Sequence, residues 1–177
     1  MKNLTSLIIF SLLLCFTSQP ARAEEEKAAP VLSVGQKFPD YNFQDPHEKP
    51  MTIAPETKLL LLSFEMELSK GIHTWLSEKD KNYLSQHNAQ YIADITPMPA
   101  IISYLFGKPK MRKYEFPIML ADDAEFGPKF PKEEEKITVM QINQDKQIES
   151  ISFYKDMNEI AAAYFGEPLP AVTEEDK

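Results

Sequence analysis

The sequence predicts an α/β domain built on a central mixed β-sheet, with helices on both faces of the sheet. Residues 59–62 are four consecutive leucines and Phe64 extends the run, which is typical of a strand buried on both faces. Apolar residues at helical spacing follow within a few positions, so a strand–turn–helix corner is expected there. Residues 137–142 and 148–153 are two β-rich runs around a short polar turn, which predicts a hairpin.

The first 23 residues predict a secretory signal peptide. Lys2 supplies a positive start, residues 4–16 are largely apolar, and Ala21-Arg22-Ala23 has the small-residue pattern of a cleavage site. The apolar segment is too short for a transmembrane helix and no second such run follows. We therefore expect a periplasmic or secreted protein, without a transmembrane segment after cleavage at Ala23.

The rest of the chain divides by composition into a disordered acidic lead (residues 24–30), one globular domain (residues 31–170) and an acidic tail (residues 171–177). Loss of the leader changes the formal charge from −8 to −10, because the leader contains two basic residues and no acidic one. This charge argues against nucleic acid and anionic membranes as partners. Cleavage also removes Cys15, the only cysteine, so we expect no thiol and no disulfide.

The first half of the domain begins with a strand at residues 41–43 and a short partner strand at residues 51–53. The central strand at residues 58–64 comes next. Ser69 is expected to cap the following helix through its hydroxyl. The apolar residues that place one face of that helix inward are Ile72, Trp75, Leu76, Tyr83 and Leu84.

The second half begins with a strand at residues 89–95. A helix that starts near Pro97 and ends at Gly107 and Pro109 follows, and its Ile101, Ile102, Leu105 and Phe106 are expected to face inward. A short strand at residues 116–120 and an acidic loop at residues 122–135 lead to the hairpin. The last helix has clear end signals. They are Asp156 before it, Glu159 three residues later as in a capping box, and Gly166 with Pro168 after it.

This order of elements resembles the thioredoxin superfamily, in particular its exported branch of TlpA-like and peroxiredoxin-like domains. Residues 34–45, which include Val34-Gly35 and Phe38-Pro39-Asp40, are similar to the opening of those domains. Residues 60–64 are similar to the strand that leads to their active site, and residues 137–148 are similar to their final hairpin. The resemblance implies a thioredoxin-like fold for residues 31–170.

The chain departs from that family at both parts of the redox site. Counting from Phe64 places Ser69 and Ile72 where the family has the cysteines of its C-x-x-C motif. Ile137 precedes Thr138 where the family has a cis-proline. A hydroxyl cannot carry out thiol–disulfide exchange, which requires a thiolate and a partner sulfur. We therefore expect no oxidoreductase activity and no catalytic residues.

Two other chemistries have candidate residues in the sequence. Ser69 and His73 are four residues apart and share a helix face, which permits a hydrolase or ligand-binding enzyme. An N-cap serine beside a solvent-exposed histidine is the favoured explanation, because a catalytic triad also needs an orienting acid and an oxyanion hole, and neither has a sequence signature here. His47, His73 and His87, with Met66 and Met98, could deliver a metal such as copper. No pair has ligand-like spacing, so we expect no metal and no cofactor.

The preferred hypothesis is a protein-binding or chaperone-like module of the bacterial cell envelope, with one or more envelope proteins as partners. Exposed methionine and leucine suit adaptable protein contacts. Lys108, Lys110, Arg112 and Lys113 form a basic cluster that is either a solvated helix end or a docking site for an acidic partner. The expected partner-binding residues are Met66, Leu68, Ser69, His73, Met98, Phe130 and Ile137.

Overall fold

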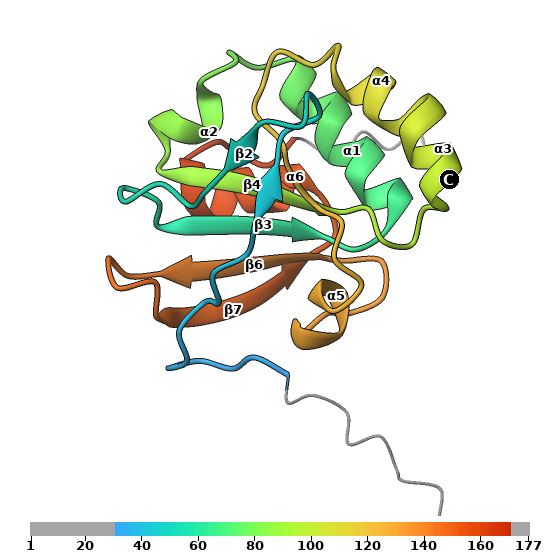
Figure 1. Cartoon of the computed structure of the whole chain (residues 1–177). Helices are drawn as coiled ribbons and strands as arrows, with labels where there is room; N and C mark the ends of the chain where they lie inside the picture. The colour runs from blue at the N-terminus through green and yellow to red at the C-terminus, as the bar shows by residue number, and fades with distance from the viewer. Residues whose placement is uncertain (1–30, 171–177) are drawn as a thin grey trace, which may run out of the picture.

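The computed structural model describes residues 31–170 of the chain, which form one seven-stranded mixed sheet with helices around it (Figure 1). The predicted signal peptide, acidic lead and acidic tail lie outside the described residues. None of the described helices is long and apolar enough to cross a membrane.

The sheet has the strand order β2-β1-β5-β4-β3-β6-β7. At its centre β3 runs parallel to β4 and antiparallel to β6, and β7 is antiparallel to β6. β5 extends the parallel part beyond β4, and β1 and β2 add a short antiparallel edge. The strands are β1 (Phe43–Gln44), β2 (Pro50–Met51), β3 (Leu59–Ser63), β4 (Ala89–Asp94), β5 (Met119–Ala121), β6 (Ile137–Ile142) and β7 (Ile148–Tyr154).

The leucine run forms β3, and its side chains alternate between two hydrophobic cores. Leu59 and Leu61 pack into one core with residues of α1, α2, α4 and α6. Leu60 and Leu62 pack into the other, which is covered by α5 and the segment around Phe38. The prediction of a central strand buried on both faces, with helices on both sides of the sheet, is confirmed.

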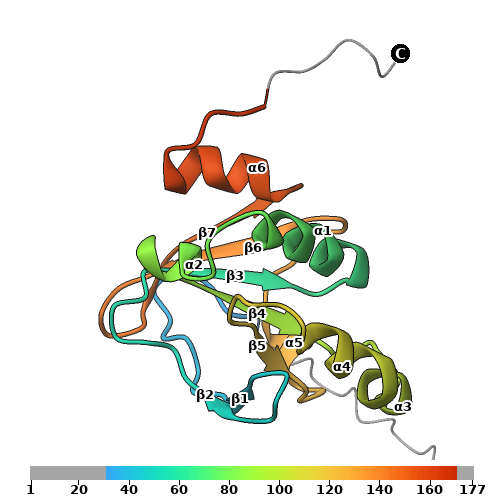
Figure 2. The same ribbon diagram turned by 90° about the horizontal axis from the view of Figure 1, so that it is seen from above.

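On the face of the sheet opposite α5, α1 lies between α6 on one side and α4 on the other (Figure 2). They are α1 (Met66–Ser77), α2 (Tyr83–Gln86), α3 (Ala100–Ile102), α4 (Lys108–Met111), α5 (Phe126–Lys129) and α6 (Met157–Ile160). Two π-helical turns extend them: η1 (Ser103–Gly107) joins α3 to α4, and η2 (Ala161–Phe165) continues α6.

The first helix differs from the prediction at both ends. It begins at Met66, with Glu65 at the N-cap in an extended conformation, so the prediction that Ser69 caps it is wrong. It also ends at Ser77, and Tyr83 and Leu84 belong to the separate helix α2. The polar residues between the two helices form turns, in which Asp80 accepts a hydrogen bond from the backbone of Asn82 at 2.8 Å.

The second predicted helix does not end at Gly107 and Pro109 but runs on to Met111. Proline lacks the backbone N–H that an α-helix interior needs. Pro109 avoids this conflict because it lies in the first turn of α4, directly after the π-helical turn η1. Such turns often mark functional sites, and this one borders the pocket described below.

The last helix has the ends that the sequence predicts. The Asp156 carboxylate accepts hydrogen bonds from the backbone N–H groups of Asn158 and Glu159 at 2.8 and 3.0 Å. The Glu159 side chain in turn accepts one from the backbone of Lys155 at 2.9 Å. Gly166 closes the helical segment in the left-handed conformation, with φ of 73°, which glycine adopts without strain.

Candidate functional site

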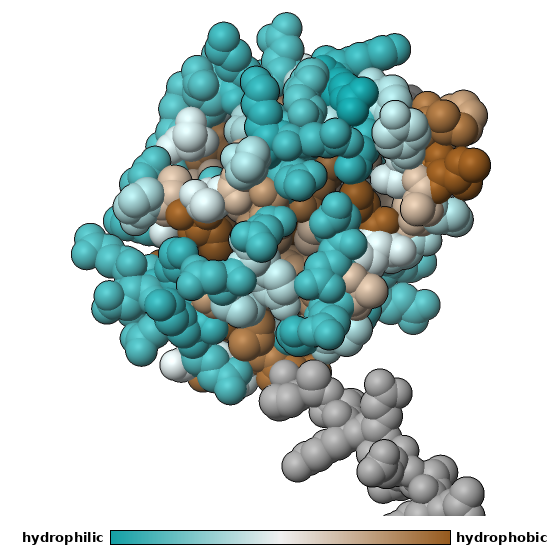
Figure 3. Space-filling view, viewed as in Figure 1, coloured by the Kyte–Doolittle hydropathy of each residue, from teal (hydrophilic) through white to brown (hydrophobic). Residues whose placement is uncertain are grey.

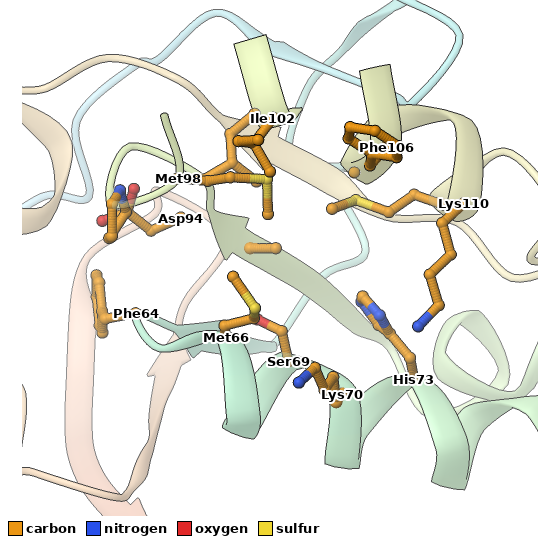
Figure 4. A pocket seen from close by; sticks show the side chains of 15 residues that line it. Phe64, Met66, Ser69, Lys70, His73, Asp94, Met98, Ile102, Phe106 and Lys110 are labelled. Atoms are coloured by element: carbon orange, nitrogen blue, oxygen red, sulfur yellow. The ribbon is translucent and has the colours of Figure 1, made fainter. Parts of the chain in front are cut away.

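A pocket of about 250 Å³ lies between α1 and the α3–η1–α4 segment, at the carboxyl end of β4. It brings together Met66, Ser69, His73 and Met98, which the sequence proposed as site residues from two separate stretches (Figure 4). The carboxyl ends of parallel strands are where open α/β sheets place their ligand sites. The remaining lining residues are Phe64, Lys70, Ala93, Asp94, Ile95, Pro97, Ile102, Phe106, Gly107, Lys110 and Met111.

His73 is buried, contrary to the expectation of a solvent-exposed histidine. Only 5% of the residue is exposed, and its ring lies among the rings of Tyr91, Tyr114 and Phe116. Burial, aided by the positive charge of Lys110, lowers the pKa of His73 from 6.5 to about 4. The imidazole is therefore neutral at pH 7, and its Nε2 has no hydrogen-bond partner among the described residues.

The Ser69 hydroxyl belongs to a buried chain of hydroxyl groups rather than to a catalytic pair. It lies 2.8 Å from the hydroxyl of Ser63 and donates to the carbonyl oxygen of Glu65 at 3.1 Å. The Ser63 hydroxyl also lies 2.8 Å from that of Tyr91, whose pKa burial raises to about 12. In the part of the chain that the structure describes, no hydrogen bond joins Ser69 to His73, so the geometry does not support the hydrolase alternative.

Leu68, Phe130 and Ile137 lie away from this pocket. Phe130 is 2% exposed and packs against Phe126 with 4.4 Å between ring centroids. Ile137 is 1% exposed and lies at the start of β6, whereas Leu68 is half-buried on the opposite side of α1. The prediction that Phe130 and Ile137 form part of a partner-binding rim is wrong, because neither side chain reaches the surface.

The three histidines lie in different surroundings. His87 contacts the rings of Tyr83 and Phe165, whereas His73 lies in the pocket and His47 in the exposed turn before β2. Within residues 31–170, no group of three histidine, cysteine, aspartate or glutamate side chains is placed to hold a metal ion.

The apolar residues of α3 and η1 lie on the surface, so the prediction that Ile101, Ile102, Leu105 and Phe106 face inward is wrong. We call Ile101, Ile102, Tyr104, Leu105 and Phe106 the α3–η1 surface; they are between 42% and 67% exposed. They lie on the part of the chain that forms a hydrophobic prominence on the upper right of Figure 3. One feature of the sequence could have indicated this surface. The apolar run is nearly continuous, does not have the pattern of a strand, and is followed directly by the basic residues of α4.

The redox positions inferred from the resemblance also need correction. Because α1 begins at Met66, Ser69 lies one turn inside the helix, and Glu65 occupies the helix start that the first cysteine was expected to take. Leu68 lies three residues after Glu65, so this register also contains no thiol pair. Ile137 precedes Thr138 inside β6, and all peptide bonds of residues 31–170 are trans.

No protein-family model and no curated protein sequence matches the chain. Solved structures with a similar fold include a peroxiredoxin-like protein from Aquifex aeolicus, at 8% identity and a TM-score of 0.49 over 78% of this chain and 90% of that one. A candidate protein disulfide isomerase from Bacteroides thetaiotaomicron has 16% identity and a TM-score of 0.49, over 77% and 88% of the two chains. A thio-disulfide isomerase from Thermus thermophilus has 12% identity and a TM-score of 0.44, over 79% and 100%.

The central strands supply the fold assignment. The unit β3–α1–β4 is parallel, and the hairpin β6–β7 followed by α6 adds β6 antiparallel to β3. Along the chain, a strand pair, a strand–helix–strand–helix unit and a hairpin followed by a helix succeed one another, which is the order on which the resemblance rests. The chain therefore has a thioredoxin-like fold.

Proposed function

We propose that this chain is a redox-inactive, thioredoxin-like module of the bacterial cell envelope that binds apolar segments of partner proteins. The observation that carries the proposal is the exposure of the α3–η1 surface. Contiguous exposed apolar residues on a soluble domain mark interaction sites. Met66, at 52% exposure, adds a flexible and polarisable side chain from α1 beside the same pocket, and such side chains adapt to varied partners.

Redox inactivity follows from the chemistry of the chain. Cys15 is its only cysteine, and the predicted cleavage after Ala23 removes it. Without two sulfur atoms the domain cannot form or exchange an internal disulfide. The fold places α1 and the α3–η1 surface next to each other, on two sides of the same pocket.

Charges beside the α3–η1 surface indicate which partner segments it suits. Lys108 forms an ion pair with Glu48 at 3.6 Å, and Arg112 donates a hydrogen bond to the carbonyl of Pro46 at 2.8 Å. Lys110 and Lys113 are exposed and form no ion pair among the described residues. Apolar segments with an adjacent acidic residue therefore fit this surface best.

Suppression of aggregation tests the proposal. When chemically unfolded citrate synthase is diluted into buffer, we expect the purified protein to lower light scattering. The double variant Leu105→Ser/Phe106→Ser should lose most of this effect, because it removes two exposed apolar contacts. Both residues are exposed, so the variant should melt within a few degrees of wild type.

Val31→Ser/Val34→Ser is the matched control. These valines are 51% and 58% exposed, similar to Leu105 at 53% and Phe106 at 66%, but they lie in the segment before β1. The control should protect citrate synthase as well as wild type does. The proposal would be contradicted if both double variants lost protection of citrate synthase equally, or if the wild-type protein gave no protection.

A further inference from the structure

The pocket between α1 and α3–η1–α4 is lined mainly by hydrocarbon and thioether groups. Ala93 of β4 and Ile95 just after it line the pocket. Ile102 and Phe106 of the α3–η1 segment line another side, together with Met98, which precedes α3 (Figure 4). A cavity of about 150 Å³ with apolar walls is large enough for benzene. At about 250 Å³, this pocket has room for a ligand with a short hydrocarbon chain or a substituted ring.

One end of the pocket carries a positive charge that the protein does not neutralise. Lys110 extends from α4 toward His73 (Figure 4). It forms no ion pair within residues 31–170. Lys70, the other basic residue that lines the pocket, is held by Glu67 at 2.5 Å. An anionic group in the pocket therefore has Lys110 as its free partner.

His73 adds unused hydrogen-bonding capacity at the same end. Its ring is buried, and its Nε2 has no partner among the described residues. A buried polar nitrogen without a partner is costly. The ring that carries this nitrogen lines the pocket beside Lys110 (Figure 4).

The opposite end of the pocket is unsuited to an anion. Asp94 lies there, and its carboxylate accepts hydrogen bonds from the backbone N–H and the hydroxyl of Thr96 at 2.9 and 2.7 Å. Its other oxygen lies against Gly127, so close that an added Cβ at this glycine would be 2.6 Å away. The negative charge of Asp94 repels a second carboxylate, which fixes the direction of an anionic ligand.

We propose that this pocket binds a small amphiphilic carboxylate such as a short fatty acid. The carboxylate lies between Lys110 and His73, and the hydrocarbon part contacts Met98, Ile102 and Phe106. This inference does not rest on the proposed function, because partner binding and carboxylate binding are measured with different ligands. Ile102 and Phe106 nevertheless belong to both sites.

Calorimetric titration of the purified protein with octanoate and with 1-octanol tests the charge requirement. Both probes have the same hydrocarbon chain, so the carboxylate accounts for any preference. Octanoate should bind about fivefold more tightly or better, the effect of one partly exposed charged contact. Lys110→Met should abolish the preference for octanoate over 1-octanol. Lys113→Met removes a neighbouring exposed lysine and should retain the preference.

Proton NMR locates the bound ligand, because the chain contains only three histidines. Addition of octanoate should shift the ring signal of His73 and leave those of His47 and His87 in place, and the His73→Phe variant assigns the signal. Absence of octanoate binding would overturn the inference. So would equal affinity for the two probes, equal effects of the two lysine variants, or an unchanged His73 signal.

Discussion

Replacement of Leu61 by aspartate is expected to destabilise the protein by about 3–5 kcal/mol. Leu61 is fully buried in β3, where it pairs with Tyr91 of β4 and Val139 of β6. The aspartate would place an unpaired charge in the larger of the two hydrophobic cores. Because domains of this size are stable by only about 5–15 kcal/mol, urea denaturation should show a large fall in the midpoint.

Gln141→Asp is a matched control for this change. Gln141 lies in the neighbouring strand β6, but its side chain is exposed. The Gln141→Asp change should therefore lower the free energy of unfolding by only about 1 kcal/mol or less. If Leu61→Asp unfolds at nearly the same urea concentration as the control, the assignment of β3 as the doubly buried central strand is wrong.

His73 is expected to make the protein about 3 kcal/mol less stable at pH 4 than at pH 7. Its pKa is about 4 in the folded state, against a reference value of 6.5. Between these two values the unfolded chain binds more protons than the folded one, so stability rises with pH. The stability that the neutral His73 provides is therefore fully present above pH 6.5 and is lost as the pH falls toward 4.

The His73→Phe variant isolates this effect, since phenylalanine fits the aromatic surroundings and does not titrate. Its unfolding free energy should equal or exceed that of wild type at pH 7, because the unpartnered Nε2 is gone. When the pH is lowered from 7 to 4, the unfolding free energy of the variant should fall by less than that of wild type. His47→Phe, which removes an exposed histidine, should retain the full acid-dependent loss. Parallel stability curves for wild type and His73→Phe would show that His73 remains solvated.

Strong local signals predicted the framework of the fold. The apolar run of residues 59–62 is short and has the pattern of a buried strand. The hairpin and the Asp156 cap each depend on residues close in sequence. The start of α1 could not be predicted in this way. Ser69 is a good capping residue, but its hydroxyl bonds to Ser63 across the corner, a contact that depends on how the helix packs on β3.

The sequence located the part of the site that contains polar residues and missed the purely apolar part. Ser69 and His73 led to the pocket, and Met98 joins them from the next strand–helix connection. Phe130 and Ile137 were misplaced because an apolar residue near a strand end has the same pattern whether it faces a rim or the core. Pro109 hid the extent of the α3–η1–α4 segment, since a π-helical turn that accommodates a proline has no clear sequence signal.

Binding of apolar protein segments by the α3–η1 surface can be measured by hydrogen–deuterium exchange in the presence of reduced and alkylated α-lactalbumin, which stays unfolded. We expect slower exchange in residues 100–107 and at the start of α1 when α-lactalbumin is added. Exchange in β6 and β7 should be unchanged, because these strands lie away from the α3–η1 surface (Figure 1). Protection confined to another part of the chain, or no protection at all, would contradict the claim that the α3–η1 surface binds apolar protein segments.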